Sequence, residues 1–321
     1  MSVLIFVELD NGNIKKTSQE AIAYGAAIAN ELGFTTTVVA IGSSSTELLA
    51  LAGNYGASKI LHVTESSLES ENSMAYAEVI AQVVESQNAE FIILSKSGLG
   101  DATAARLAPK VGAALISGVC ELPKFEGGLS VKRSIYTGKA FAEVAVTAAK
   151  KILLIKKNAV EYQTSDASAQ VEAFSPTLSQ ASFVAEVTGI EKAQSELSLT
   201  EADIIVSGGR GMKGPETWQP VLDLAKALGA ATGCSKPVSD LDWRPHHEHI
   251  GQTGIKVAPN LYIACGISGA IQHLAGVNGS KCIVVINKDP EAPFFKAADY
   301  GIVGDVFDIL PRLTKAVEAT N

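Results

Sequence analysis

Residues 202–212 read ADIIVSGGRGM, and this stretch decides how the last third of the chain folds. The apolar, β-branched run at residues 204–206 predicts a buried strand, and Ser207 and then glycines interrupted by Arg210 follow it. Glycines let a backbone approach an anion closely, and an arginine donates two hydrogen bonds to a phosphate. The stretch therefore predicts a phosphate-binding loop at a strand end, with a glycine-rich turn and a solvated arginine as the alternative.

A second strand of this kind lies further along, at residues 261–276, which read LYIACGISGAIQHLAG. The strand stops at Gly266, and Ser268 and Gly269 lead into a helix whose N-terminus suits an anion. The spacing differs from GxGxxG, and no acidic residue is clearly placed about 20 positions on, so a standard NAD site is disfavoured. His273 lies one helical turn beyond Ser268, and a partly buried structural histidine is the alternative interpretation there.

Between these two loops, residues 249–254 read HIGQTG, which predicts a tight turn that presents Gln252 and Thr253 to a ligand. The preceding HHEH at residues 246–249 suggests a metal site. Consecutive residues cannot share one face of a helix, however, so we expect no metal there. Residues 233–236, GCSK, end another strand with a hydroxyl and a cation. Asn287 and Asp305 add polar groups later, and Asp305 is also a candidate helix N-cap.

The elements around these loops predict a second, doubly wound parallel sheet. Strands are expected at residues 202–206, 230–233, 254–258, 261–265 and 282–287, and helices at 218–228, 270–276 and 306–317.

The first half of the chain shows the rhythm of βαβ units, with short β-branched runs alternating with Ala-rich amphipathic stretches. Asp101 is expected to cap a helix at residues 101–111. Three extended pieces at residues 131–136, 141–147 and 152–155 are expected to be antiparallel strands that complete a mostly parallel first sheet. The polar residues 157–180 predict a linker or an edge segment. The fold class is therefore α/β with two domains, an N-terminal α/β domain at residues 1–180 and a second at residues 181–321.

The composition narrows the classes of partner. The net charge of −8 disfavours nucleic acid, because a phosphate backbone would be repelled. The four cysteines stand far apart without a CxxC pair, so we expect reduced thiols and neither a disulfide nor zinc. The first residues do not resemble a secretory leader, so we expect none, and no run of about 20 apolar residues suggests a membrane span. We expect a cytoplasmic protein.

Taken together, VSGGRG, GCSK, HIGQTG, GISGAIQHLAG, INKDPEAP and DYGIVGD resemble, in order and spacing, the FAD-binding domain of electron transfer flavoprotein α subunits. The similarity is dense over residues 200–321. It is weaker in the first domain, where it depends on VLIFVE and GDATAARLAPKVGA. The positions that correspond to the family's FAD contacts are Arg210, Ser235, Lys236, Ile250, Gly251, Gln252, Thr253, Ser268, Gly269, Ala270, Ile271, Gln272, His273, Asn287, Asp305 and Val306.

The resemblance also implies what these residues do. Thr253 is expected to approach flavin N5 with Gln252 nearby, and His273 to lie by the pyrimidine carbonyl near N1. Ser268 and the helix start after it would serve the pyrophosphate or ribityl chain, while Asn287 and Asp305 would hold the adenosine end. The family commonly has arginine where this chain has Lys236, so stacking on the ring is lost while the charge remains. On this basis His273 and Lys236 are expected to tune the flavin as cations and donors beside the ring, which favour its anionic reduced form.

The implied function is an electron carrier without a catalytic residue of its own. It is expected to form a heterodimer with a β subunit, to accept electrons from flavin dehydrogenases such as acyl-CoA dehydrogenase in fatty acid β-oxidation, and to pass them to a quinone oxidoreductase. The alternatives are a bifurcating variant of the family, a nicotinamide-dependent enzyme on a related sheet, in which His247 or His273 would be the base, and a nucleotide-binding regulator without redox chemistry.

Overall fold

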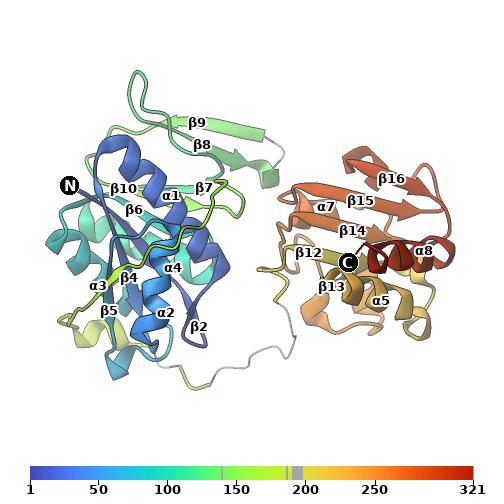
Figure 1. Ribbon diagram of the computed structural model, residues 1–321, viewed down its shortest axis with the longest axis horizontal. Helices are drawn as coiled ribbons and strands as arrows, with labels where there is room; N and C mark the ends of the chain where they lie inside the picture. Colours follow the sequence, from blue (N-terminus) through green and yellow to red (C-terminus); the bar gives the residue numbers. More distant parts are fainter. Residues whose placement is uncertain (139, 186, 190–197, 321) are drawn as a thin grey trace. The chain divides into compact units, whose positions relative to one another are not determined.

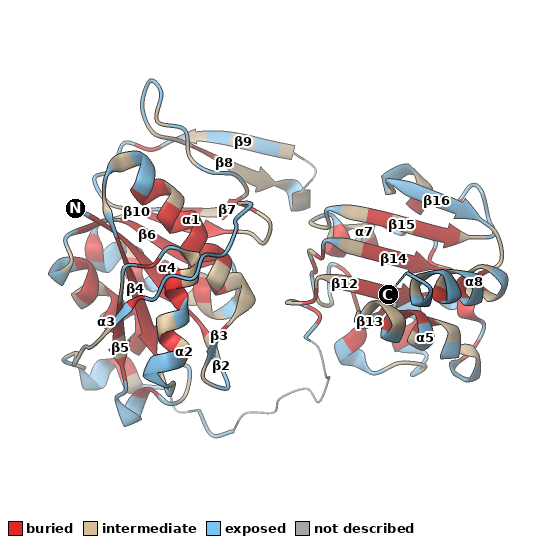
Figure 2. Ribbon diagram, viewed as in Figure 1, coloured by how far each residue is buried: buried red, intermediate tan, exposed pale blue. Residues whose placement is uncertain are grey.

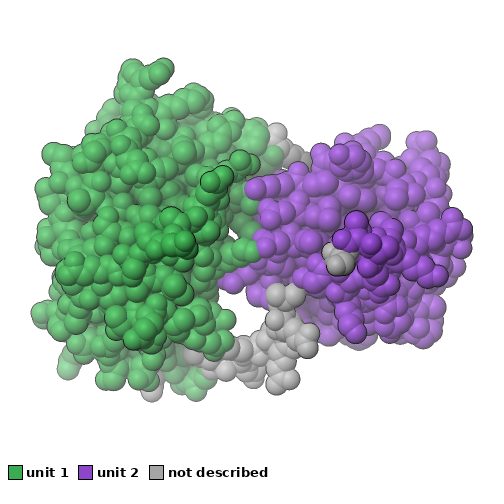
Figure 3. All heavy atoms as spheres, in the orientation of Figure 1, with its two compact units in different colours: residues 1–190 green, residues 191–321 purple. Residues whose placement is uncertain are grey.

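The computed structural model describes residues 1–138, 140–185, 187–189 and 198–320. The chain separates into two compact units, Met1–Ile190 and Glu191–Asn321, coloured separately in Figure 3. Each unit has its own sheet and its own hydrophobic core, which confirms the predicted two-domain α/β class. The boundary expected at residue 180 stays a prediction.

A nine-stranded sheet forms the centre of the first unit in the described part of the chain (Figure 1). Its order is β11-β5-β4-β1-β6-β10-β7-β8-β9, and only the β7–β8 and β8–β9 pairs are antiparallel. The strands are β1 Ser2–Val7, β4 Thr35–Ile41, β5 Lys59–Val63, β6 Ala89–Ser95, β7 Ala114–Val119, β8 Ser130–Ile135, β9 Ala140–Ala145, β10 Lys151–Ile155 and β11 Gln170–Ala173. A small hairpin of β2 Leu9–Asp10 and β3 Asn13–Ile14 follows β1.

Strand β10 corrects one expectation. Residues 152–155 were expected to be antiparallel, but β10 runs parallel to both β6 and β7 and lies between them. Ile152, Leu153 and Leu154 are all buried, so both faces of the strand are covered. A short strand that is apolar on both faces is typical of the interior of a parallel sheet, whereas β8 and β9 form the antiparallel pair that was expected.

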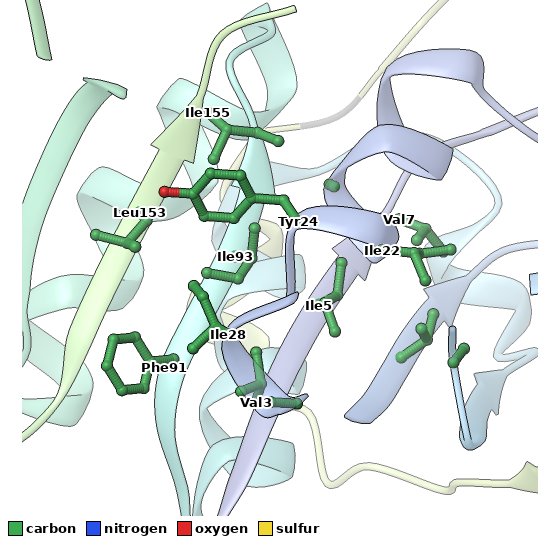
Figure 4. Close-up of a cluster of buried hydrophobic side chains, with 14 of the residues drawn as sticks. Val3, Ile5, Val7, Ile22, Tyr24, Ile28, Phe91, Ile93, Leu153 and Ile155 are labelled. Carbon is green, nitrogen blue, oxygen red and sulfur yellow. The ribbon is translucent and has the colours of Figure 1, made fainter. Parts of the chain in front are cut away.

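Helices cover both faces of this sheet. They are α1 Lys16–Leu32, α2 Thr46–Ala50, α3 Ser73–Ser86 and α4 Gly98–Val111. Alternate residues of β1 enter different cores, Val3 and Ile5 on the side of α1, and Leu4 and Phe6 on the side of α3 and α4. Figure 4 shows the first of these cores, where Tyr24 of α1 lies over the sheet. Because successive side chains of a strand point to opposite faces, one sheet can pack against helices on both sides.

Helix α4 begins earlier than expected. Its N-cap is Ser97, whose hydroxyl accepts from the Gly100 N–H at 2.8 Å. Asp101 instead lies in the first turn and pairs with Lys96 at 2.7 Å. The expected cap was wrong because the glycines before Asp101 are helical here.

The polar segment at residues 157–180 supplies the edge of the sheet. Strand β11 pairs in parallel with β5. Beyond it, the chain lies along α3, where Glu78 accepts from the Ser179 N–H at 3.2 Å and Gln82 donates to the Thr177 carbonyl at 2.7 Å. Of the two alternatives, the edge segment therefore describes residues 170–173.

The second unit contains a five-stranded, all-parallel sheet in the order β13-β12-β14-β15-β16. Its strands are β12 Ile204–Gly208, β13 Ala231–Cys234, β14 Leu261–Cys265, β15 Cys282–Asn287 and β16 Tyr300–Val303, and its helices are α5 Gln219–Leu228, α6 Lys236–Asp240, α7 Ile271–Val277 and α8 Val306–Glu318. Cores lie on both faces of the sheet, one beneath α5 and α8 and one on the side of α7, and its central strands are buried (Figure 2). The predicted doubly wound fold is confirmed.

Two details of this sheet differ from expectation. The strand expected at residues 254–258 does not form, and the segment retains only a bridge between Ile250 and Ile255. The Val257 N–H donates to the Gly276 carbonyl at 2.8 Å, so this backbone bonds to α7 rather than to a neighbouring strand. Strand β16, whose residues are all exposed, was not foreseen. No described helix is both long enough and apolar enough to cross a bilayer.

Candidate functional site

The order of the second sheet marks its binding edge. Numbered along this unit, the strands run 2-1-3-4-5, so the direction of winding reverses between β12 and β14. In such sheets a ligand binds beyond the carboxyl ends of the strands at this reversal. All strands are parallel, so their carboxyl ends meet at one edge.

All the predicted FAD contacts follow carboxyl ends of these five strands. Arg210 follows β12; Ser235, Lys236 and residues 250–253 follow β13; residues 268–273 follow β14; Asn287 ends β15; and Asp305 and Val306 follow β16. The fold therefore brings residues separated by almost a hundred positions to one edge of one sheet.

The glycines of the first two loops interlock. Gly209 N–H donates to the Cys265 carbonyl at 2.9 Å, and Gly211 N–H donates to the Gly266 carbonyl at 3.0 Å. A Cβ added to Gly209 would lie 2.4 Å from the Gly266 oxygen, and one on Gly211 would lie 2.6 Å from the Gly266 Cα. Both glycines are therefore required for contact between the loops. The exposed side chain of Arg210 has no hydrogen-bond or ion-pair partner among the described residues.

The loop at residues 250–253 is held from both sides. Ile250 N–H donates to the Cys234 carbonyl at 2.9 Å, and Gln252 N–H donates to the Gln272 carbonyl at 2.7 Å. These bonds tie the loop to the end of β13 and to α7, while the Gln252 and Thr253 side chains stay exposed. The predicted presentation of these two side chains is thus compatible with the loop geometry.

Backbone donors gather after β14. Within the described part of the chain, the N–H groups of residues 268–272 donate to no protein acceptor. Gly269 has φ +84°, and a Cβ there would lie 2.5 Å from Phe294, so glycine is needed for the turn into α7. The turn presents several unsatisfied donors at the binding edge, as an anionic or carbonyl-rich ligand requires.

His273 is a buried polar group of the site. The residue is 6 % exposed, its Nε2 lies 2.8 Å from the Tyr262 hydroxyl, and its Nδ1 has no hydrogen-bond partner among the described residues. Burial, with a smaller effect of His249, lowers the pKa of His273 to about 4. His273 is therefore neutral at neutral pH, and the expected tuning of the flavin would come from a neutral donor rather than from a cation.

Ser235 and Lys236 start α6. Ser235 is buried, and its N–H donates to the Gly208 carbonyl at 3.1 Å, which links the loops after β12 and β13. Lys236 is exposed and faces Asp240 at 4.0 Å. An exposed pair at this distance holds the ammonium group only weakly, so Lys236 can turn toward a ligand.

The remaining predicted contacts also have structural roles. Asn287 donates to the Ile267 carbonyl at 3.0 Å, and Asp305 caps α8 by accepting from the Phe307 N–H at 3.0 Å. Val306 is buried in the core beneath α8. The N-cap alternative for Asp305 is confirmed. The contacts of these three residues with a ligand stay predictions.

The HHEH stretch supports the loop that follows it. Glu248 accepts from Arg244 at 2.8 Å and from Thr232 at 3.3 Å, and the Arg244 guanidinium lies over the Trp218 ring. His249 is buried beside Gly254. Over residues 198–320, as in the rest of the described chain, no group of three His, Cys, Asp or Glu side chains is arranged to hold a metal ion.

Two residues at this edge were missed by the sequence analysis. Lys213 has φ +71°, lies 3.9 Å from Asp305 and covers the Phe307 ring, so it joins the β12 loop to α8. Its left-handed backbone leaves no signal in the sequence. Tyr262 reads as an ordinary core residue of a strand, and only the fold reveals its contact with His273.

Comparison with known proteins identifies the family. Residues 3–179 match the model of the electron transfer flavoprotein domain, and residues 198–278 match that of the electron transfer flavoprotein FAD-binding domain. The chain is 38 % identical to the electron transfer flavoprotein subunit alpha of Bacillus subtilis, over 99 % of this chain and 98 % of that protein. It is 36 % identical to the subunit alpha of Pseudomonas aeruginosa (99 % and 100 %) and 35 % identical to a probable mitochondrial subunit alpha of Caenorhabditis elegans (98 % and 93 %).

These matches cover both units and favour the electron carrier over the nicotinamide-dependent enzyme. The chain belongs to the electron transfer flavoprotein α-subunit family, whose FAD-binding domain it carries and whose function is electron transfer.

Proposed function

We propose that the carboxyl edge of the second sheet holds the FAD and that the residues gathered there are its contacts. The observation that carries this proposal is the convergence of all the predicted contacts on one edge, together with the unsatisfied N–H groups of residues 268–272. The donor set fits the group. FAD offers a pyrophosphate and ring carbonyls as acceptors, and the edge offers cations, amides, hydroxyls and backbone N–H groups.

We assign the predicted contacts to successive parts of the cofactor. Lys236 serves the isoalloxazine ring, Gln252 and Thr253 its N5 edge, and His273 its pyrimidine edge. Arg210 serves a phosphate or a flavin carbonyl. The turn at residues 268–270 serves the pyrophosphate or ribityl chain. Asn287 and Asp305 serve the adenosine end, with buried Val306 supporting the start of α8.

FAD supplies the one- and two-electron chemistry when it is bound. The chain contributes position and electrostatics. The Lys236 ammonium group favours negative charge on the ring, and neutral donors such as the Thr253 hydroxyl and the His273 imidazole stabilise it through hydrogen bonds. No described residue needs to form a covalent bond or transfer a proton for this role.

We further propose that the chain acts in a heterodimer with an electron transfer flavoprotein β subunit, as the word subunit in its relatives' names suggests. The domain at residues 1–180 would serve this assembly, and the FAD-binding domain would span residues 181–321. The donors would be flavin dehydrogenases such as acyl-CoA dehydrogenase, and the acceptor a quinone oxidoreductase. Four free cysteines fit a cytoplasmic location.

The test is FAD binding by the αβ complex and by two matched variants. Arg210→Ala removes an exposed cation from the binding edge, and Arg312→Ala removes an exposed cation from α8. If the proposal holds, Arg210→Ala raises the Kd for FAD about tenfold, the value of one charge-assisted hydrogen bond, and Arg312→Ala leaves it unchanged. Equal Kd values for the two variants would contradict the site.

A further inference from the structure

Three rings lie together beneath the turn after β14. The ring centroids of Tyr262 and His273 are 6.1 Å apart, and Phe294 lies 5.7 Å from His273 and 6.3 Å from Tyr262. Tyr262 and Phe294 are fully buried, and His273 nearly so. This packing holds the imidazole in one place, so only the position of its proton can vary.

The Tyr262 hydroxyl keeps its proton and needs an acceptor for it. Burial raises the pKa of Tyr262, so the phenol is not ionised. Among the described residues, the partner in hydrogen-bond geometry is His273 Nε2 at 2.8 Å, and the buried Ser207 hydroxyl also faces the phenol, where as a donor it opposes the effect of burial on the pKa of Tyr262. The O–H group can therefore be satisfied by donating to Nε2.

The two neutral tautomers of His273 differ in free energy in this environment. If Nε2 carried the proton, it would donate to the Tyr262 oxygen, which the Ser207 hydroxyl also faces as a donor. The tautomer with the proton on Nδ1 instead leaves Nε2 free to accept from Tyr262, while the Tyr262 oxygen can accept from Ser207, so that no buried donor is orphaned. The backbone of Ile250 also faces the ring and favours a proton on it.

We propose that Tyr262 is a positioning residue that fixes His273 in the tautomer with its proton on Nδ1, so that a neutral imidazole offers an N–H donor to the bound flavin. This inference rests on the proposed FAD site for its consequence and on the contact between Tyr262 and His273 for its tautomer. His273 Nδ1 is buried and has no hydrogen-bond partner among the described residues, as expected of a donor kept for a ligand. Tyr262 itself acts only through the imidazole.

The experiment is solid-state NMR of the FAD-loaded αβ complex with ¹³C,¹⁵N-labelled histidine at neutral pH. Each ring nitrogen is identified by the carbon atoms bonded to it, and the His273 signals are those absent from a His273→Gln complex. We expect a protonated Nδ1 and an unprotonated Nε2. Tyr262→Phe should reduce the ratio of the two tautomers at least about fivefold, the change that one ordinary hydrogen bond supports. Tyr300→Phe, at an exposed tyrosine of β16, is the matched control and should change nothing.

A proton on Nε2 in the unsubstituted complex overturns the inference, and so does an unchanged tautomer ratio in Tyr262→Phe. The NMR result is separate from cofactor content. If the complex cannot be loaded with FAD and yet shows the Nδ1 proton, the tautomer is supported and the proposed flavin site is contradicted instead.

Discussion

Gly276 of α7 lies directly against Gly251 of the loop after β13, so closely that a Cβ on Gly276 would come within 2.6 Å of the Gly251 Cα and N atoms. Helix α7 thereby fixes the position of the loop that presents Gln252 and Thr253. This contact makes the helix part of the site, although Gly276 itself is buried and reaches no ligand.

We expect Gly276→Ala to lift this loop and weaken FAD binding about tenfold, since overpacking a close contact costs about 1–3 kcal/mol. The measurement is the Kd for FAD of the αβ complex. Gly98→Ala is the matched control, because a Cβ there meets nothing within 4 Å. If Gly276→Ala binds FAD as tightly as the control does, the loop is not held by this contact.

Lys236→Ala should make the one-electron potential of the flavin more negative, because a positive charge that favours the reduced ring is removed. Lys236 is exposed, so screening limits the shift to about 10–40 mV. Lys236→Arg should shift it less. Spectroelectrochemical titration measures the potential, with Lys226→Ala, on the last turn of α5, as the control for charge alone. A shift of the same size in the control would remove Lys236 from the site.

Asp305 can be tested for two roles separately. Asp305→Ala removes the cap of α8 and should lower the free energy of unfolding by about 1 kcal/mol, whereas Asp305→Asn keeps a capping oxygen and should preserve it. Urea unfolding of the complex measures this difference. If Asp305 also holds the adenosine end of FAD, the Asn variant should bind FAD more weakly despite its normal stability. Normal binding by Asp305→Asn would leave no need for the carboxylate in FAD binding.

The pH dependence of the free energy of unfolding should report the protonation of His273. Its pKa is lowered from 6.5 to about 4, so between these values the unfolded chain binds a proton that the folded chain excludes. The free energy of unfolding therefore falls as the pH is lowered through this window. From about pH 7 to about pH 5, we expect the unsubstituted complex to lose on the order of 1–2 kcal/mol more than His273→Gln does. Urea unfolding at both pH values checks this, and His249, which remains in both proteins, cancels. Equal losses would mean that His273 is not buried in its neutral form.

Much of the fold was open to prediction because its signals are local. Strands β14 and β15 are apolar runs bounded by glycine or asparagine, and α5 and α8 have helical periodicity with Gly229 and Asp305 at their ends. The place of β10 was not open to prediction. This strand lies between two strands that precede it in the sequence, and that position is decided by packing between distant segments. The structure of residues 254–258 was not open to prediction either. Their β-branched pattern favours a strand, but the segment forms a backbone hydrogen bond with Gly276 instead.

The site divides in the same way. Gln252, Thr253 and Ser268 could be singled out because glycines flank them, and the parallel sheet explains why they converge. The neutral state of His273 could not be foreseen, since it depends on Tyr262, eleven positions earlier, and on Phe294, which comes from a later loop. Burial of a histidine by residues from three segments has no local pattern.

The interlocked glycines after β12 and β14 have a consequence for genetic screens of this protein. Any side chain at Gly209, Gly211 or Gly266 would collide with the opposing loop before it met a cofactor. Alleles at these codons should therefore appear first as poor yield of folded subunit, insensitive to riboflavin supplementation. Alleles at exposed edge positions such as Arg210 should yield normal amounts of pale protein that added flavin restores to colour.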